Sequence, residues 1–329
     1  MLLLGLKLEV VIMTVADQLK RISNMEAIVQ KNVRNLSWFT AISRAAAGGL
    51  LASAKSIAEH HQPHVCIVTG LYLPHGEPPC GETDGPIGAA HLAAAFHRVG
   101  IPCRLVTDRP SAGAITAAAR GAGLATDFPI DVASVDDAGD DRGTPVEEIE
   151  KIWKKLSPAV SHVISIERIG ISADGAPRNM RGVDISCYNA PLEKLFFGQP
   201  WTTIGIGDGG NEIGMGSIYR TVRAANIPYG DKSACIVPCD HLIVATISNW
   251  GAIGLIGAVA ILRSDLREGL LKGLTRESDY KILEQAVFKG PAISMPSWNQ
   301  QPAIQVLKVD GEPWEVQADI LEEIVRAVA

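Results

Sequence analysis

The most informative part of this sequence is the glycine-rich stretch Ile204-Gly205-Ile206-Gly207-Asp208-Gly209-Gly210-Asn211-Glu212-Ile213-Gly214-Met215-Gly216. Six of its thirteen residues are glycine, and its polar side chains belong to an aspartate, an asparagine and a glutamate. It follows an apolar segment typical of a strand, 202–206. Because glycine has no Cβ, backbone N–H groups can approach a ligand closely here, and successive amides of this kind bind anions. We therefore expect a loop that holds an anion directly or through a metal ion, with a plain strand–helix turn as the alternative.

Outward from this stretch, short buried-strand patterns alternate with helical ones. The expected strands are 64–69, 103–107, 130–134, 160–166, 202–206 and 241–246, and the expected helices include 85–99, 111–122, 144–156, 249–263 and 278–288, with another after Glu212. This alternation predicts an α/β fold with a mostly parallel sheet and helices on both faces. Residues 1–60 are interpreted as a helical N-terminal extension and residues 61–329 as the α/β domain, together one structural unit. Within the tail, 304–329, we expect a small strand, a turn at Asp310-Gly311 and a closing helix.

Composition limits the classes of partner. The 329 residues are 47% hydrophobic and 20% charged, with a formal net charge of −6, which argues against binding to nucleic acid or to an anionic membrane. Six cysteines in a chain of this length do not form a disulfide framework, so we expect a reducing, cytoplasmic setting. The apolar segment 1–13 is too short to span a bilayer and lacks a basic leader; translation from Met1 or from Met13 fits equally well.

The residues that follow the strands are the candidates for chemistry, because ligands of open α/β sheets bind beyond the carboxyl ends of the strands. Acidic, amide, hydroxyl and arginine side chains recur there. They are Thr69, Glu82, Thr83, Asp84, Glu167, Arg168, Asp208, Asn211, Glu212 and Asn249, and the polar loop 167–186 adds Arg181 and Asp184. By contrast, the segment 32–49 has Val33-Arg34-Asn35 in place of a clear Asp/Arg/Gly motif, which weakens the case for substrate contact from the N-terminal helices.

Common cofactor motifs do not explain these residues. Gly205-x-Gly207-x-x-Gly210 matches a dinucleotide fingerprint in spacing. However, Asp208 and Glu212 would repel a pyrophosphate by several kcal/mol unless a metal intervened. There is no Walker A sequence and no G-x-S-x-G elbow. We therefore expect no organic cofactor.

Taken together, the motifs resemble those of the D-glutamate cyclase-like family. They are Thr69-Gly70, Glu82-Thr83-Asp84-Gly85-Pro86, Glu167-Arg168, Arg181-Gly182-Val183-Asp184, the run Gly207–Gly216 and Ser248-Asn249-Trp250-Gly251. The resemblance covers roughly residues 25–290. It implies a lyase that cyclises D-glutamate to 5-oxo-D-proline with loss of water, acting on a small acidic substrate.

This chemistry suggests roles for the residues at the strand ends. We expect Glu82, Asp84, Glu167, Asp208 and Glu212 to be catalytic, with Glu82 or Asp208 as general base. Substrate binding is expected from Thr69, Thr83, Arg168, Arg181, Asp184, Gly207, Gly209, Gly210, Asn211 and Asn249. In particular, Arg168 and Arg181 would bind carboxylates, and the amides of 207–210 would stabilise an oxyanion. Asp84, Asp208 and Glu212 could instead ligate Mg²⁺ or Mn²⁺.

Two other functions use the same residues. One is a metal-assisted hydrolase or phosphoryl-transfer enzyme acting on a small acidic metabolite. The other is a non-catalytic module that binds such a metabolite. In all three cases a homo-oligomer is compatible with the sequence.

Overall fold

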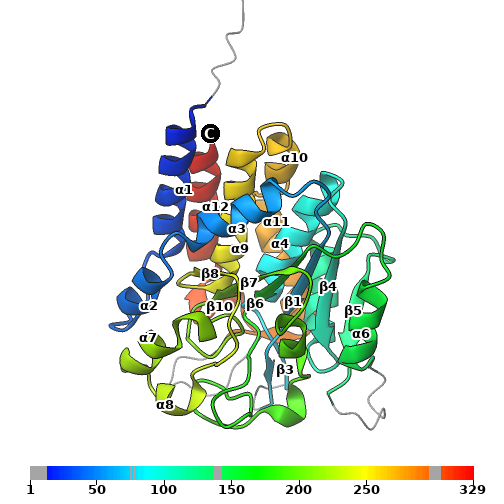
Figure 1. The fold of residues 1–329 in the computed structure, drawn as a ribbon, viewed down its shortest axis with the longest axis vertical. Coiled ribbons are helices and arrows are strands. Elements are labelled where there is room, and N and C mark those ends of the chain that lie inside the picture. The colour runs from blue at the N-terminus through cyan, green and yellow to red at the C-terminus, as the bar shows by residue number, and fades with distance from the viewer. Residues whose placement is uncertain (1–12, 75, 77–78, 136–142, 296–304) are drawn as a thin grey trace, which may run out of the picture.

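The computed structural model describes residues 13–74, 76, 79–135, 143–295 and 305–329. Its centre is a six-stranded sheet in which every pairing is parallel (Figure 1). The strands, in spatial order, are β5 (Ile130–Ala133), β4 (Cys103–Asp108), β1 (Val65–Thr69), β6 (His162–Ile166), β7 (Thr202–Gly207) and β8 (His241–Val244). The expected α/β fold is confirmed, and each of the six predicted strands is present.

The two faces of the sheet are both buried because successive side chains of a strand point to opposite sides. On β1, Val65 and Ile67 join one apolar cluster, whereas Cys66 and Val68 join another. On β8, Ile243 belongs to the first cluster and Leu242 to the second. This double burial explains why the strands read as continuous apolar runs in the sequence.

Helices cover both faces (Figure 1). The first cluster is covered by α1 (Val15–Val29), α3 (Gly49–Ala58), α4 (Pro86–Arg98), α5 (Ala112–Gly121), α9 (Ser248–Leu262), α10 (Arg267–Leu271), α11 (Arg276–Lys289) and α12 (Trp314–Val328). The second is covered by α2 (Phe39–Ala45), α6 (Val146–Trp153) and α7 (Tyr219–Ala224), with the 3₁₀ turns η2 (Leu192–Phe196) and η3 (Gly216–Ile218). The short helix α8 (Gly230–Ser233) follows α7. A further 3₁₀ turn, η1, spans Ser186–Tyr188.

The N-terminal helices are part of the main core. Ile22 and Met25 of α1 and Leu50 of α3 lie in the same cluster as Trp250 of α9. At the other end of the chain, α12 lies beside α1, where Arg21 donates a hydrogen bond to the carbonyl of Val328 (3.0 Å). Residues 1–12 of the expected extension lie outside the described residues.

Two smaller β structures stand at the carboxyl edge of the sheet. One has the order β2 (Tyr72–Leu73), β3 (Cys80–Glu82), β9 (Ala292–Ile293). The other is a hairpin of β10 (Lys308–Val309) and β11 (Glu312–Pro313) that turns at Asp310-Gly311, as predicted. Both bring chain segments that are distant in sequence to the ends of the main strands.

One expected element differs from the structure. The helix predicted after Glu212 begins later, because Glu212 forms an antiparallel bridge with Ile169. The chain then passes through η3 before α7 starts at Tyr219.

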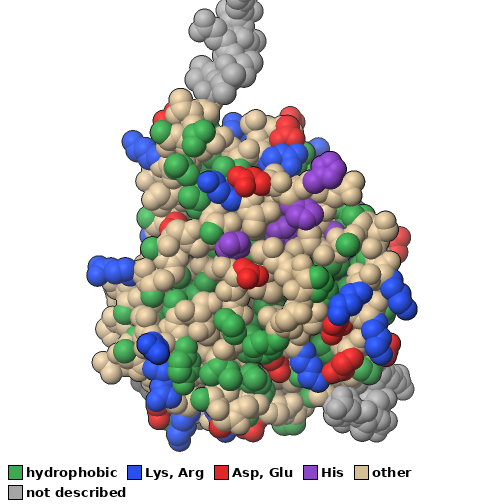
Figure 2. Space-filling view, viewed as in Figure 1, with side chains coloured by type: hydrophobic (Ala, Val, Ile, Leu, Met, Phe, Trp, Pro, Cys, Tyr) green, Lys and Arg blue, Asp and Glu red, His purple; other side chains and the backbone are tan. Residues whose placement is uncertain are grey.

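None of the described helices is long and apolar enough to cross a membrane. On the face shown in Figure 2, basic and acidic side chains are interspersed among apolar and neutral ones.

Candidate active site

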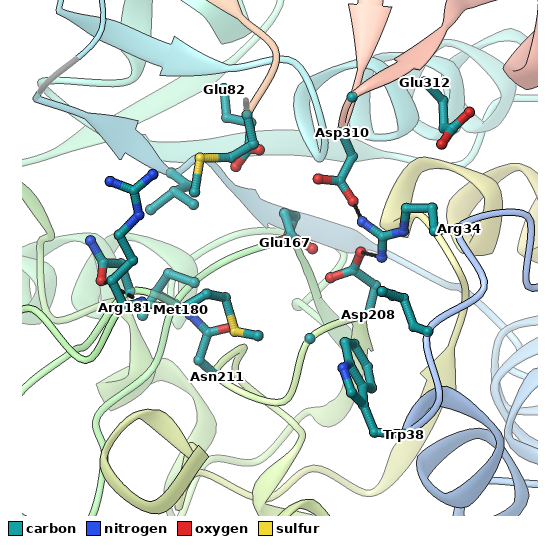
Figure 3. A pocket seen from close by; sticks show the side chains of 17 residues that line it. Arg34, Trp38, Glu82, Glu167, Met180, Arg181, Asp208, Asn211, Asp310 and Glu312 are labelled. Carbon is teal, nitrogen blue, oxygen red and sulfur yellow. Dashed lines mark hydrogen bonds and ion pairs between the residues drawn. The ribbon is translucent and has the colours of Figure 1, made fainter. Parts of the chain in front are cut away.

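A cavity of about 350 Å³ opens at the carboxyl edge of the sheet (Figure 3). From β1 the chain adds β4 and then β5 toward one side of the sheet, and it then adds β6, β7 and β8 toward the other side. The order of the strands therefore switches between β1 and β6. Such a switch point is where open α/β sheets bind their ligands. The lining residues are Arg34, Leu36, Trp38, Leu71, Glu82, Glu167, Ile169, Asn179, Met180, Arg181, Asp208, Gly209, Asn211, Met295, Asp310, Gly311 and Glu312.

Three buried acids reach this cavity from three different elements. Glu82 ends β3, Glu167 follows β6, and Asp208 follows β7. Figure 3 shows Glu82, Glu167 and Asp208 around the same space. The sequence prediction that these strand ends meet is therefore confirmed by the geometry.

A tight carboxylate cluster lies at the base of this arrangement. Asp84, Glu167 and Asp208 each offer an oxygen, and these oxygens lie within 4.8 Å of one another. Carboxylate oxygens are the ligands that Mg²⁺ and Mn²⁺ prefer, so this trio can hold a divalent cation. The metal-binding set that we expected from the sequence contained Glu212, whereas the cluster in the structure contains Glu167 in its place.

Glu167 is held rigidly in that cluster. Its Oε2 accepts a hydrogen bond from the hydroxyl of Ser248 (2.6 Å). Its backbone has φ = 48°, in the left-handed region that non-glycine residues rarely adopt. Strain of this kind costs about 1–3 kcal/mol and is concentrated at functional sites.

Burial and mutual repulsion change the protonation of these acids. Desolvation, reinforced by the charge of Asp84, raises the pKa of Glu82 well above its usual range. Desolvation and then Asp208 raise the pKa of Glu167 well above its usual range too. The same two causes raise the pKa of Asp84 to about 7. Near neutral pH the site therefore retains carboxyl protons that ordinary acids would have lost.

Two of the acceptor atoms in the cavity wall have neither a hydrogen bond nor an ion pair among the described residues. Oε2 of Glu82 and Oδ1 of Asn211 are buried and accept no hydrogen bond from the described residues. Glu82 is only 3% exposed and Asn211 only 2%. Because a buried polar atom without a partner is costly, such atoms in a cavity wall mark places where a ligand can bind.

The glycine-rich loop does bind a carboxyl group, but that group belongs to the chain itself. Both oxygens of Glu212 are engaged by backbone amides: Oε1 accepts from Asp208 (3.3 Å) and Gly209 (2.7 Å), and Oε2 accepts from Gly210 (2.7 Å). A Cβ added at Gly207 would lie 3.0 Å from Glu212 Cβ, so a larger residue there would press on the Glu212 side chain. The geometry thus overturns our assignment of these amides to a substrate oxyanion and of Glu212 to a metal.

Arg168 does not line the cavity. It is fully buried, donates to the carbonyls of Gly70 (2.7 Å) and Ala190 (2.8 Å), and is ion-paired with Asp108 at 2.5 Å. A buried pair of this kind fixes loops together, and the guanidinium has no access to a substrate carboxylate. Arg181, the other arginine we expected, lines the cavity wall opposite Arg34 (Figure 3).

Several residues that we expected to contact the substrate are not among those that line the cavity. Thr83 donates its hydroxyl to the carbonyl of Lys308 (2.9 Å). Thr69 is fully buried behind the lining. Asn249 is also fully buried, and its side-chain oxygen accepts from Gly85 (2.9 Å) and Gly88 (2.7 Å). Asp184 accepts from Ser186 on an exposed loop, so the structure does not bring it to the cavity.

Sequence reasoning missed the N-terminal and C-terminal contributions. Arg34, from the segment whose sequence weakens the case for substrate contact, lines the cavity and donates to Asp208 (2.7 Å). Trp38, Asp310 and Glu312 line it as well. The structure brings this segment to the cavity because Gln30 donates to the carbonyl of Val244 at the end of β8 (3.2 Å) and Arg34 reaches Asp208 beyond the end of β7.

Comparisons with known proteins agree with the geometry. Residues 25–325 match the model of the family described as "D-glutamate cyclase-like, C-terminal". The chain is 32% identical over 221 residues to the human protein named "D-glutamate cyclase, mitochondrial". That alignment covers 64% of this chain but only 34% of the human protein, so the chain spans about a third of its relative.

Proposed function

The chain belongs to the D-glutamate cyclase-like family, and from this premise we propose that it is a lyase that converts D-glutamate to 5-oxo-D-proline and water. The activity named for the human relative motivates the choice of substrate. The observation that carries the proposal is the buried carboxyl group of Glu82, whose Oε2 has no described partner, beside the cluster of Asp84, Glu167 and Asp208.

The reaction needs both proton transfer and charge neutralisation. The α-nitrogen of glutamate forms a bond to the γ-carboxyl carbon, and one carbon–oxygen bond of that carboxyl group breaks. Overall, two protons leave the ammonium group and two join the departing oxygen, which leaves as water. A carboxylate resists attack by a nucleophile, so its charge must be offset while this occurs.

Glu82 is suited to carry these protons. Its raised pKa makes its carboxylate a stronger base than an ordinary glutamate, and its protonated form a usable acid near neutral pH. We assign it two successive transfers from the substrate nitrogen to the departing oxygen. The cavity holds the substrate bent, and orientation of this kind corresponds to effective molarities of about 10⁵ M or more.

The donor set fits a divalent cation. Asp84, Glu167 and Asp208 would hold Mg²⁺ or Mn²⁺, and the ion would polarise the substrate γ-carboxylate. Without a cation, so many neighbouring buried carboxylates would repel an acidic substrate strongly. Asp84 and Glu167 must both lose their protons to bind the ion, and both have raised pKa values, so binding should tighten as the pH rises.

The alternatives fit the site less well. A phosphoryl-transfer enzyme would need free amides to cradle a phosphate, and those of Asp208, Gly209 and Gly210 are bonded to Glu212. A module that only binds an acidic metabolite is the remaining rival. A cytoplasmic location and a homo-oligomeric state stay predictions from the sequence.

The test is a direct assay of the purified chain with D- or L-glutamate, in EDTA, Mg²⁺ or Mn²⁺, with 5-oxoproline measured by chiral chromatography. We expect product from the D enantiomer, dependent on the divalent cation and lost in Asp208→Asn. Glu193→Gln is the matched control, since Glu193 is also a buried acid but does not line the cavity. Binding of D-glutamate without product in any condition would favour the binding module, and release of phosphate from phosphate esters would favour the hydrolase.

A further inference from the structure

Arg34 lies between two carboxylates that come from opposite ends of the chain. Its Nη2 donates to Oδ2 of Asp208 (2.7 Å), and its Nη1 forms an ion pair with Oδ2 of Asp310. Figure 3 shows both contacts at one side of the cavity. Nε of Arg34 is buried, and among the described residues it has no hydrogen-bond partner.

The two carboxylates differ in how firmly they are placed. Asp208 belongs to the buried acid cluster, and its side chain is 9% exposed. Asp310 stands at the tip of the β10–β11 hairpin with φ = 48°, and its side chain is 17% exposed. A hairpin tip with a rotatable side chain at the rim can release its partner more easily than a residue of the cluster can.

The charge of the cavity gives Arg34 a role beyond holding segments together. Glu82, Glu167, Asp208, Asp310 and Glu312 all line it, and an acidic ligand must meet a cation to enter. Arginine is a planar cation with several separate N–H donors, so one guanidinium can hold two carboxylates at once. When Asp310 leaves, the Nη1 group of Arg34 becomes free to donate to a ligand carboxylate, while Nη2 stays bonded to Asp208.

We propose that Arg34 binds a carboxylate of the substrate and that Asp310 is an internal competitor that the substrate displaces. Arg34 keeps its bond to Asp208, which orients the guanidinium, and exchanges Asp310 for the ligand. This inference rests on the proposed function only in taking the ligand to be a small carboxylic acid.

Calorimetric titration with D-glutamate and with glutarate tests the exchange. Asp310→Asn removes the competing charge, so the dissociation constant should fall about three- to tenfold. Arg34→Gln should raise it about 10- to 100-fold. Arg34→Lys should also weaken binding, because a compact ammonium group lacks the two separate Nη donors that hold Asp208 and the ligand carboxylate together.

The Arg104–Asp131 pair supplies matched controls. It has similar side-chain exposure, 19% and 15%, and joins β4 to β5 outside the cavity lining. Arg104→Gln and Asp131→Asn should leave both dissociation constants unchanged. If Arg34 only ties segments together, Asp310→Asn will weaken binding or leave it unchanged, and either result overturns the inference even if Arg34→Gln fails to fold.

The two proposals fail separately. If the dissociation constants change as expected in the Arg34 and Asp310 variants but the protein makes no 5-oxoproline, the cyclase activity is refuted and the role of Asp310 as a competitor is supported. Turnover of D-glutamate with an unchanged KM in Arg34→Gln and in Asp310→Asn would support the cyclase activity and refute the role of Asp310 as a competitor.

Discussion

Asp84, which lies just before α4, caps the start of α9, and Asn249, in the first turn of α9, caps the start of α4. Oδ1 of Asp84 accepts the backbone N–H of Asn249 (2.8 Å) and Oδ2 that of Ser248 (2.9 Å), at the start of α9. In return, Oδ1 of Asn249 accepts the N–H groups of Gly85 (2.9 Å) and Gly88 (2.7 Å), at the start of α4. Two side chains thus satisfy four backbone donors of two helices. The exchange also fixes the Asp84 carboxylate within the acid cluster.

Loss of this exchange should be costly. Asn249→Ala leaves the buried N–H of Gly88 without its acceptor, at about 1–3 kcal/mol, and leaves the N–H of Gly85 with Asp84 alone. Thr275→Ala is the matched control, because Thr275 caps α11 through one exposed bond to Ser278 (3.1 Å) and should cost about 1 kcal/mol. Urea unfolding measures both. Equal losses of unfolding free energy in the two variants would show that the reciprocal caps are not a special source of stability.

Glu82→Gln should abolish most catalysis while leaving substrate binding nearly intact. Gln has the same shape but cannot accept and return a proton, so kcat should fall about 10²- to 10⁴-fold with little change in KM. Steady-state kinetics with D-glutamate measure this. Glu193→Gln, a buried acid whose pKa is also raised chiefly by desolvation, should keep the wild-type kcat. A wild-type kcat in Glu82→Gln would remove the proton carrier from our proposal.

The same logic separates Glu212 from the catalytic acids. Burial and Asp208 raise the pKa of Glu212 to about 8, so it is largely protonated at neutral pH, and Gln is a fair substitute. Glu212→Gln should lower kcat less than about tenfold, since it keeps an oxygen for the loop amides. Glu212→Ala should lower kcat more, because three amides lose their acceptor. A loss in Glu212→Gln as large as that in Glu82→Gln would give Glu212 a direct role.

The sheet could be predicted because its strands carry their signal locally. β1 and β6 are short apolar runs between polar loops, and both faces of each are buried, so no alternation obscures them. The position of Glu167 and Asp208 at one edge then follows from the parallel pairing of β6 with β7, whereas Glu82 reaches the same cavity from the separate sheet β2–β3–β9. Of the residues that sequence reasoning assigned to the site, those that line this one cavity are Glu82, Glu167, Arg181, Asp208, Gly209 and Asn211.

The remainder depended on information that is not local. Arg34 and Asp310 meet only because the first and last segments of the chain fold over the same strand ends, and no spacing rule connects positions so far apart. Arg168 and Arg181 look alike in the sequence, yet only the packing of Asp108 against Arg168 removes that arginine from the cavity. The role of Glu212 had a local signal, since a glutamate directly after several glycine amides can fold back on them.

The stability of the fold should depend on pH through His162, at the start of β6. Burial, and secondarily His60, lowers the pKa of His162 to about 4. Because the folded state disfavours its protonation, the stabilisation is fully present above the unfolded pKa of about 6.5 and is lost as the pH falls through 4, about 3 kcal/mol in all. His162→Gln should flatten the dependence of unfolding free energy on pH over this range. His61→Gln, at an exposed position, is the control and should leave the pH dependence of the unfolding free energy as steep as in the wild type. If the dependence stays equally steep in His162→Gln, the acid sensitivity belongs to other groups.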